Sequence, residues 1–534
     1  MKQIRTMRTF MLKERLLAIK DKTGKNSNDR IVFDITQDDK LEIYPLSIIA
    51  KDKSLYFIAK HNNIKYLYIL YNQADQAQVQ NITGVNLNLE DDSADFKLRR
   101  ALLNHENARQ LQKIFDFTRP KPFGTQTSIG LGDRLGLANP GHLRAIKGTN
   151  IKAILAQQSI RELNRTKRKP EDVMDAAVWA VFQEGYHEGF GADADHLKTT
   201  QDIDLMMQAG YTMFTFDPSD YVANEADHLS TFKLSNRAKE LPWLELNIDL
   251  ENLVERYKDK KNVVDETFTL KPTLHEILRA IVKYGGALAH MNRMYQYVIE
   301  NYSDRPFEIE LSVDETQAVT SPFDHYFIAN ELIRMQIEFI SLAPRFIGAF
   351  EKGVDYRGDL DIFQQEYIKH MKIARLLGPY KLSFHSGSDK FAVYERVGLL
   401  HDRFIHIKTA GTSYLEALRT IALENPKLFR EILDFARNQY DSEKKTYHVS
   451  ADLSRVRSGT SYNNVELKNL LDDDNVRQVL HVTFGRVLTE LDDRGKYLFK
   501  DRFIKCLIEN EDTYSDFIET HFKRHIAPFV KVIT

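Results

Sequence analysis

The chain has 534 residues, of which 74 are basic and 76 acidic, and 43% are hydrophobic. This composition is typical of a soluble protein with one large domain and a smaller unit, and the net charge of -2 gives no electrostatic reason to expect nucleic acid as a partner. No run of about 18 apolar residues predicts a membrane helix. The single cysteine, Cys506, excludes an internal disulfide framework and is typical of a cytoplasmic protein.

The first 120 residues are expected to form a small unit of their own. Short runs of β-branched and aromatic residues alternate there with polar turns, which is typical of antiparallel strands. The expected strands span residues 30–35, 41–44, 54–58 and 64–70, and His61–Asn63 indicates a hairpin turn between the last two. We therefore expect a β-rich appendage followed by a linker helix over residues 1–120.

Residues 121–534 show a different pattern, in which short apolar runs alternate with helical segments. Eight strands are expected at residues 127–132, 153–158, 189–195, 211–217, 307–314, 338–343, 380–385 and 403–408. Eight strands that alternate with helices predict an α/β fold in which a parallel sheet closes into a (β/α)8 barrel of the TIM type.

Helix start and stop signals support this alternation. Pro170 and Ser321–Pro322 are typical of helix starts, and an amphipathic run extends from Gly358–Asp359 to Gly378. Ser413–Glu416 has the spacing of a capping box.

Two further helical regions extend the barrel. A connection over about residues 221–306 has helices of its own and could supply a lid or a contact in a homo-oligomer. One of these helices is expected at 272–300, with a soft point at Gly285–Gly286, where two consecutive glycines weaken the helix. Residues 420–530 are expected to form a helical C-terminal region.

Polar residues are concentrated where the expected strands end. The clearest cases are Phe307–Glu315, Tyr380–Lys390 and Phe404–Tyr414, each an apolar run that ends in acidic, basic or imidazole side chains. Because the carboxyl ends of all strands in such a barrel open onto one face, these residues are expected to surround a single pocket. The pattern favours an enzyme over a binding or scaffold protein.

Nine segments also resemble one known family. They are Gly132–Gly136, Ala156–Ser159, Phe182–Tyr186, Gly189–His196, Phe214–Asp220, Ser312–Thr316, His385–Lys390, Lys408–Tyr414 and Tyr447–Asp452. In this order, between about residues 125 and 530, they closely resemble the tagaturonate/fructuronate epimerase family. The resemblance implies a metal-dependent interconversion of D-tagaturonate and D-fructuronate, with a neutral ketohexose such as D-tagatose as an alternative substrate.

The chemistry of this reaction restricts the mechanism. The two sugar acids differ at a hydroxyl-bearing carbon that is beta to the ketone, so simple enolisation does not acidify the right C–H bond. Retro-aldol cleavage and reclosure through an enediolate held by a divalent cation would invert that carbon. An aldolase would use the same chemistry but release its fragments. Transient oxidation by NAD is the other alternative, although Gly130–Gly136 lacks the G-x-G-x-x-G spacing.

A metal site in the barrel mouth requires imidazole or carboxylate ligands from several strand ends. Glu310, His385 and His406 are the predicted ligands of a divalent cation, Mn, Ni, Co or Zn, and Asp195–His196 is the reserve pair. A single histidine is more often a core residue than a ligand, but three polar groups that point into one barrel make this explanation weaker.

Proton transfer and substrate binding need further residues. Asp195, Asp217 and Lys408 are the predicted acid and base groups, although Asp217 before Pro218 is also typical of a turn. The substrate carboxylate suits basic residues and a helix start. The predicted substrate-binding residues are Ser159, Arg161, Arg345, Lys390, Thr412 and Ser413.

Overall fold

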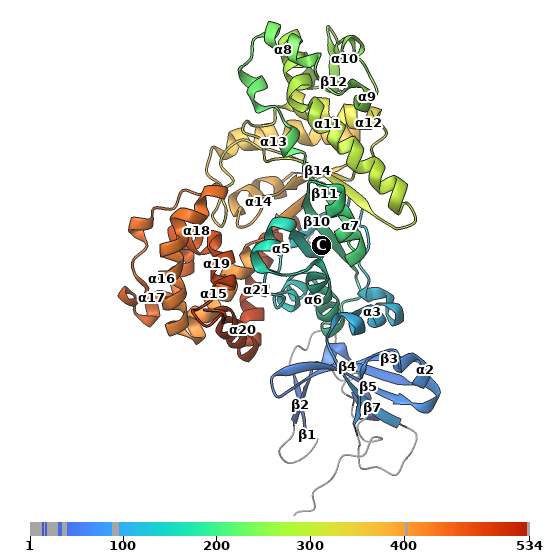
Figure 1. The fold of residues 1–534 in the computed structure, drawn as a ribbon, viewed down its shortest axis with the longest axis vertical. Helices are drawn as coiled ribbons and strands as arrows, with labels where there is room; N and C mark the ends of the chain where they lie inside the picture. Colours follow the sequence, from blue (N-terminus) through green and yellow to red (C-terminus); the bar gives the residue numbers. More distant parts are fainter. Residues whose placement is uncertain are drawn as a thin grey trace, which may run out of the picture.

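The structure, a computed structural model, describes residues 13–14, 16–18, 30–34, 40–87, 96–400 and 404–530. A barrel lies at the centre, with a small antiparallel sheet at one end, an inserted helical region at the other and C-terminal helices along one side (Figure 1). No helix among these residues is long and apolar enough to cross a membrane.

The barrel has eight parallel strands and is closed. Its order is β8, β9, β10, β11, β14, β15, β16 and β17, and β17 pairs with β8. The strands are β8 Ser128–Leu131, β9 Lys152–Ser159, β10 Phe190–Leu197, β11 Met213–Phe216, β14 Glu308–Val313, β15 Ser341–Pro344, β16 Lys381–Phe384 and β17 Ile405–Thr409. All eight strands expected from the sequence are confirmed, with small shifts at their ends.

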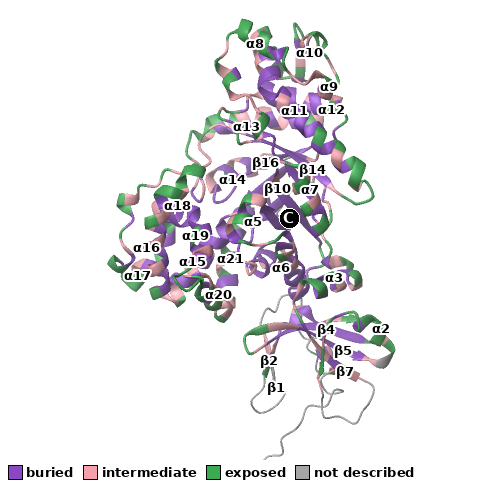
Figure 2. Cartoon of the chain, viewed as in Figure 1, coloured by how far each residue is buried: buried purple, intermediate pink, exposed green. Residues whose placement is uncertain are grey.

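The barrel strands are buried on both faces (Figure 2), because helices cover the outside and side chains fill the inside. On β14, Ile309 and Leu311 alternate with Glu308 and Glu310. Since successive side chains of a strand point to opposite faces, this alternation sends the carboxylates into the barrel. The interior therefore contains charged groups that need partners, and these partners determine the architecture of the site.

Helices surround the barrel as α4 Asn139–Ile146, α5 Ile160–Thr166, α6 Pro170–Gln183, α7 Thr200–Ala209, α12 Pro322–Arg334, α13 Leu360–Leu377, α14 Phe391–Gly398 and α15 Thr412–Glu424. The expected starts at Pro170 and Ser321–Pro322 are confirmed, and α13 lies between Asp359 and Gly378 as predicted.

The predicted capping box at Ser413–Glu416 is wrong. Gly411 is the N-cap of α15 and makes no side-chain cap. The Ser413 hydroxyl instead donates a hydrogen bond to the Gly132 carbonyl at 2.9 Å, which ties the start of α15 to the end of β8.

The N-terminal unit is a seven-stranded antiparallel sheet followed by a helix. Its elements are β1 Ile31–Asp34, β2 Lys40–Ile43, β3 Ile49–Lys51, β4 Ser54–His61, β5 Ile64–Asn72, β6 Gly84–Leu87, β7 Phe96–Leu102, and the helices α2 Gln76–Val79 and α3 His105–Ile114. The four expected strands are confirmed, whereas β3, β6 and β7 were not expected. The hairpin turn is also confirmed, since Asn62 and Asn63 have φ values of 49° and 63° between the paired strands β4 and β5.

The insertion after β11 comprises α8 Thr231–Ala238, α9 Trp243–Leu246, α10 Leu250–Tyr257, the hairpin β12 Asn262–Asp265 and β13 Phe268–Leu270, and α11 Leu274–Tyr302. The predicted soft point in α11 is wrong, because the helix continues through Gly285–Gly286. Both glycines serve close packing: a Cβ at Gly285 would lie 2.7 Å from Leu241, and one at Gly286 would lie 2.9 Å from the Tyr221 carbonyl oxygen.

The helical C-terminal region is confirmed. It contains α16 Pro426–Glu443, α17 Asn464–Asn469, α18 Asp474–Val482, α19 Phe484–Thr489, α20 Lys500–Glu509 and α21 Glu511–Ile526. Helix α21 packs closely on α4, where a Cβ at Gly141 would lie 2.7 Å from the Ser515 carbonyl oxygen. This contact fixes the C-terminal region against the barrel.

The two glycines of α11 provide a matched test of this packing. Gly286→Ala should lower the free energy of unfolding by about 1–3 kcal/mol, because the new methyl meets a backbone oxygen that cannot move independently. Gly285→Ala should change it by less than about 1 kcal/mol, since the Leu241 side chain can shift and alanine favours the helix. Urea denaturation of both variants measures the difference, and equal effects would contradict it.

Candidate active site

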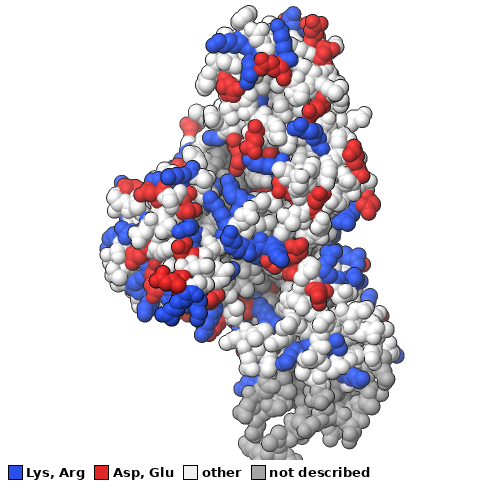
Figure 3. All heavy atoms as spheres, in the orientation of Figure 1, with Lys and Arg blue, Asp and Glu red and all other residues white. Residues whose placement is uncertain are grey.

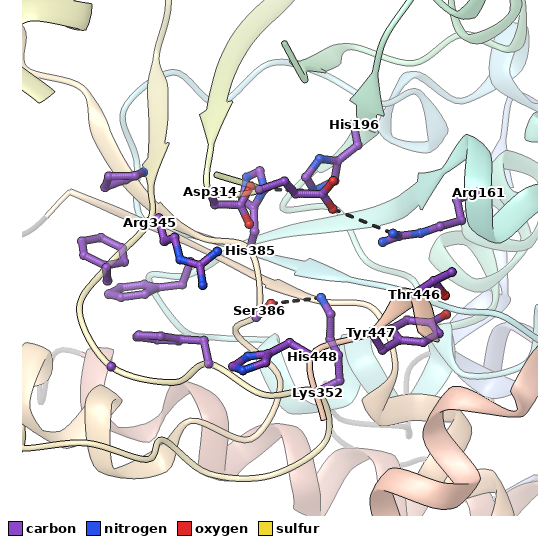
Figure 4. A pocket seen from close by; sticks show the side chains of 16 residues that line it. Arg161, His196, Asp314, Arg345, Lys352, His385, Ser386, Thr446, Tyr447 and His448 are labelled. Carbon is purple, nitrogen blue, oxygen red and sulfur yellow. Dashed lines mark hydrogen bonds and ion pairs between the residues drawn. The ribbon is translucent and has the colours of Figure 1, made fainter. Parts of the chain in front are cut away.

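A cavity of about 190 Å³ lies at the carboxyl ends of the barrel strands (Figure 4). Side chains at or just after the ends of β10, β14, β15 and β16 line it, together with Arg161 of α5 and residues 446–448 of the C-terminal region. It shares several residues with an adjoining space of about 30 Å³ that reaches Ser159 and Asp195. Polar groups from distant parts of the sequence thus meet at one place, as expected for this barrel.

Two imidazoles face each other in this cavity. His196 Nε2 lies 3.1 Å from His385 Nδ1. Carboxylates flank both atoms: Asp195 Oδ1 lies 3.8 Å from His196 Nε2, and Asp314 Oδ1 lies 3.3 Å from His385 Nδ1. Within the described chain, Asp195, His196 and His385 form one of three groups with metal-ligand geometry.

The far nitrogens of both rings contact carboxylates as well. His196 Nδ1 lies 3.3 Å from Asp217 Oδ2, and His385 Nε2 lies 2.6 Å from Glu310 Oε1. When each far nitrogen carries the proton and donates it to its carboxylate, the two facing nitrogens present lone pairs toward the same point. This is the arrangement in which metal-binding histidines are usually held, and the donor set therefore fits a divalent cation.

The electrostatics at this point also favour positive charge. Burial lowers the pKa of His196, but Asp195, Asp217 and Asp314 outweigh burial and raise it to about 10. The pKa of His385 is likewise raised, because its acidic neighbours outweigh both burial and the repulsion from Lys408. The surrounding carboxylates would stabilise a bound cation in the same way.

Lys408 lies below the imidazoles at the centre of the barrel. Its Nζ lies 2.9 Å from Asp193 Oδ2, 2.7 Å from Asp195 Oδ1 and 2.7 Å from Glu310 Oε1, and it donates to Thr215 Oγ1 at 2.6 Å. Burial disfavours the ammonium, but the three carboxylates outweigh it and raise the pKa of Lys408 well above its ordinary value. Lys408 is therefore a fixed cation and hydrogen-bond donor rather than a free base.

The two aspartates of β10 differ in charge preference. Burial is the largest influence on both, and it raises the pKa of Asp193 to about 6. For Asp195, the attraction of Lys408 and of the two imidazoles outweighs burial and lowers the pKa. Asp195 is therefore ionised beside the cavity.

The structure does not bring all predicted ligands together. Glu310 lies behind His385, as its hydrogen-bond partner, on the side away from His196. His406 is fully buried, its Nδ1 lies 2.9 Å from Ser128 Oγ, and it is absent from the three groups with metal-ligand geometry found among the described residues. The reserve pair Asp195–His196 lies at the facing imidazoles instead.

Several predicted substrate residues also point elsewhere. The buried Lys390 ammonium donates to the carbonyls of Glu351, Val354 and Ser388 at 2.5–2.9 Å. Thr412 and Ser413 are buried at the start of α15, where backbone and side-chain partners hold their hydroxyls. They were predicted because a basic side chain and a helix start suit a carboxylate, but their contacts direct these side chains to other partners.

Other predicted residues do face the cavity. Arg161 and Arg345 line the larger space, and Ser159 lines the smaller one, where its hydroxyl also caps α5. Lys and Arg side chains gather on this face where α5 approaches the C-terminal helices (Figure 3).

Sequence reasoning missed several cavity residues, among them Asp314, Tyr447, His448 and Lys352. Asp314 and Tyr447–His448 lie in segments that carried the family resemblance, so their position in the motifs was the available signal. Lys352 lies in the loop between β15 and α13, and no sequence pattern marked it.

A separate buried group, Asp389, His521 and His525, also has metal-ligand spacing. Its nitrogens and oxygens are already in use: His525 Nε2 accepts the Asp389 amide at 3.0 Å, and His521 contacts Asp389 at 2.5 Å. Arg477 pairs with Asp389 at 2.8 Å. These contacts account for the group as a link between the loop after β16 and the C-terminal helices.

The fold and site define a TIM-barrel enzyme that carries its functional groups at the carboxyl ends of the strands. A family model described as tagaturonate epimerase matches residues 44–529. The tagaturonate/fructuronate epimerase of Thermotoga maritima is 40% identical over 495 residues, which cover 91% of this chain and 96% of that protein. The native structure of fructuronate-tagaturonate epimerase from Cohnella laeviribosi has a TM-score of 0.84 at 37% identity, covering 91% of this chain and 96% of that one.

A glycerol complex of the Cohnella laeviribosi enzyme gives a TM-score of 0.83 at 36% identity, covering 91% of this chain and 96% of that chain. The chain belongs to the tagaturonate epimerase family and is an isomerase of the epimerase class. The family resemblance and the fold expected from the sequence are confirmed.

The facing imidazoles predict which residues control metal content. If the cation binds between them, His196→Asn and His385→Asn should each lose most of the divalent cation retained after reconstitution and desalting, because each would remove one of the two facing nitrogens. Asp217→Asn should weaken binding by about 10- to 100-fold, since it removes only the group that orients His196. Elemental analysis measures the content, with His406→Asn and the exposed His105→Asn as controls. Full metal content in both ligand variants would refute the assignment.

Proposed function

We propose that this protein interconverts D-tagaturonate and D-fructuronate in the cavity at the barrel mouth. Membership of the tagaturonate epimerase family supports the reaction class, and the relatives named above are epimerases of these two sugar acids. The observation that carries the proposal is the pair of facing imidazoles with flanking carboxylates beside a polar cavity.

We assign His196 and His385 as the residues that would hold a divalent cation, with the carboxylates of Asp195 and Asp314 beside them. Such a cation supplies stabilisation of the oxyanion charge that develops in the reaction. Asp217 and Glu310 orient the two rings from behind. Glu310 thus has a supporting role in this proposal in place of the ligand role predicted from the sequence.

Asp195 is the proposed base that takes the proton of the reacting hydroxyl. Its carboxylate is ionised and borders the smaller space, and Lys408 holds it at 2.7 Å. Loss of that proton allows the neighbouring carbon–carbon bond to break. The electrons of this bond move to the fragment that contains the ketone, which becomes an enediolate, and the other fragment becomes an aldehyde. Rotation of the aldehyde and reclosure of the same bond invert the carbon, and Asp195 returns the proton.

Two arginine side chains, on different sides of the cavity (Figure 4), suit the substrate carboxylate. Arg161 and Arg345 line the larger space with Tyr447 and three phenylalanine rings. The guanidinium of Arg161 lies 3.8 Å from Glu315 Oε1, and Arg345 donates to the Thr316 carbonyl. These contacts fix both side chains at the cavity wall and leave further donors for an anion.

Metal dependence gives the first test. Chelation should abolish conversion of D-tagaturonate, and Mn, Ni, Co or Zn should restore it, with products resolved by chromatography. Full activity of the metal-free protein would refute the proposed cation. Release of free three-carbon products would instead indicate an aldolase.

Isotope content tests the route. In retro-aldol chemistry the hydrogen on the inverted carbon stays on the aldehyde, so D-fructuronate formed in D2O should contain no deuterium at that carbon. Mass spectrometry and NMR of the product measure this. Deuterium at the inverted carbon would contradict the route, and stoichiometric NAD in the denatured protein would favour transient oxidation.

A further inference from the structure

Three cationic side chains line the cavity, and they differ in their partners. Arg161 forms an ion pair with Glu315, and Arg345 donates to a backbone carbonyl. Lys352 donates to Ser386 Oγ at 3.0 Å, and within the described part of the chain its Nζ has no carboxylate within ion-pair distance. Of the three, only Arg161 has a carboxylate partner among the described residues, whereas Lys352 and Arg345 have none.

The position of Lys352 distinguishes it from Arg345, which lines only the larger space. Its side chain borders both the larger and the smaller space and points toward Ser386, next to His385 (Figure 4). Burial and the repulsion from Arg161 lower its pKa, and the carboxylates of Asp314, Glu315 and Glu162 offset this effect only in part. Lys352 is half-buried, and a carboxylate bound beside its ammonium would offset the remaining cost of this charge.

The C-terminal region holds the residues on both sides of Lys352, through the side chain of Glu351 and the backbone of Gly353. Gln478 Nε2 donates to Glu351 Oε2 at 2.9 Å, and Ser450 Oγ donates to the same oxygen at 2.6 Å. Arg477 Nε donates to the Gly353 carbonyl at 2.7 Å. The residues before and after Lys352 are therefore fixed by α18 and by the segment before it, which leaves only the lysine side chain free to adjust.

The backbone of Lys352 is held in the same way. Its amide donates to the His448 carbonyl at 3.3 Å, and its carbonyl accepts from Gln478 Nε2 at 3.3 Å. A lysine on such a clamped segment is preorganised for a ligand, because little backbone freedom remains to be lost on binding.

We propose that Lys352 is the principal residue that binds the substrate carboxylate and thereby selects a sugar acid over a neutral sugar. This assignment rests on the proposed function. It identifies the residue that binds the carboxylate end of the substrate, as distinct from the end that reacts at the facing imidazoles. It also gives the C-terminal helices a role, since they hold the selecting residue over the barrel mouth.

The test compares two non-reacting ligands that differ in one group: D-galactonate, which has a carboxylate, and galactitol, which has a hydroxymethyl group in its place. Calorimetry measures their binding to the metal-loaded protein. Lys352→Met should weaken D-galactonate binding by about 10- to 150-fold, because a charge-assisted contact is lost, and should leave galactitol binding within about twofold. Lys352→Arg should retain most of the D-galactonate affinity.

Lys523→Met is the matched control, because it removes an exposed lysine that pairs with Glu519 on α21. Metal content and thermal unfolding establish that each variant is folded. Equal weakening of both ligands in Lys352→Met would overturn the proposal, as would unchanged D-galactonate binding. Since binding is measured without turnover, failure of the wild type to convert D-tagaturonate would refute the proposed function separately.

Discussion

The site depends on one buried ammonium. Lys408 extends from β17 across the barrel and contacts carboxylates of β10 and β14, so one side chain joins strands that are distant in the sequence. Three carboxylates around one lysine leave negative charge at the barrel mouth, and this charge favours a cation at the imidazoles directly above. Loss of the lysine would leave several buried carboxylates uncompensated, which typically costs about 3–5 kcal/mol.

The functional groups are arranged in layers above this lysine. Glu310 contacts Lys408 on one side and His385 on the other, so the charged core also orients an imidazole. Asp195 contacts Lys408 and borders the cavity. Substitutions in the core are therefore expected to affect chemistry as well as stability, because the same hydrogen bonds serve both.

The C-terminal helices complete the cavity from outside the barrel. Residues 446–448 form part of the wall, and α18 fixes the loop that carries Lys352. A TIM barrel typically builds its site from the loops at the carboxyl ends of its strands. Here an additional helical region determines how one of these loops is held, and the family model also covers this region.

The sequence by itself determined the eight strands, the helix starts at Pro170 and Ser321, and the family, because periodicity, capping residues and ordered motifs are local properties. It also identified Asp195, His196 and His385 as polar residues at strand ends. Only the tertiary structure decided that His196 faces His385. It also showed that His406 and Lys390 are buried with partners outside the cavity, and that Lys352 lines it. Alternation assigns a side chain to a face of a strand, but its distance from other groups depends on barrel register, loop conformation and packing between regions far apart in the sequence.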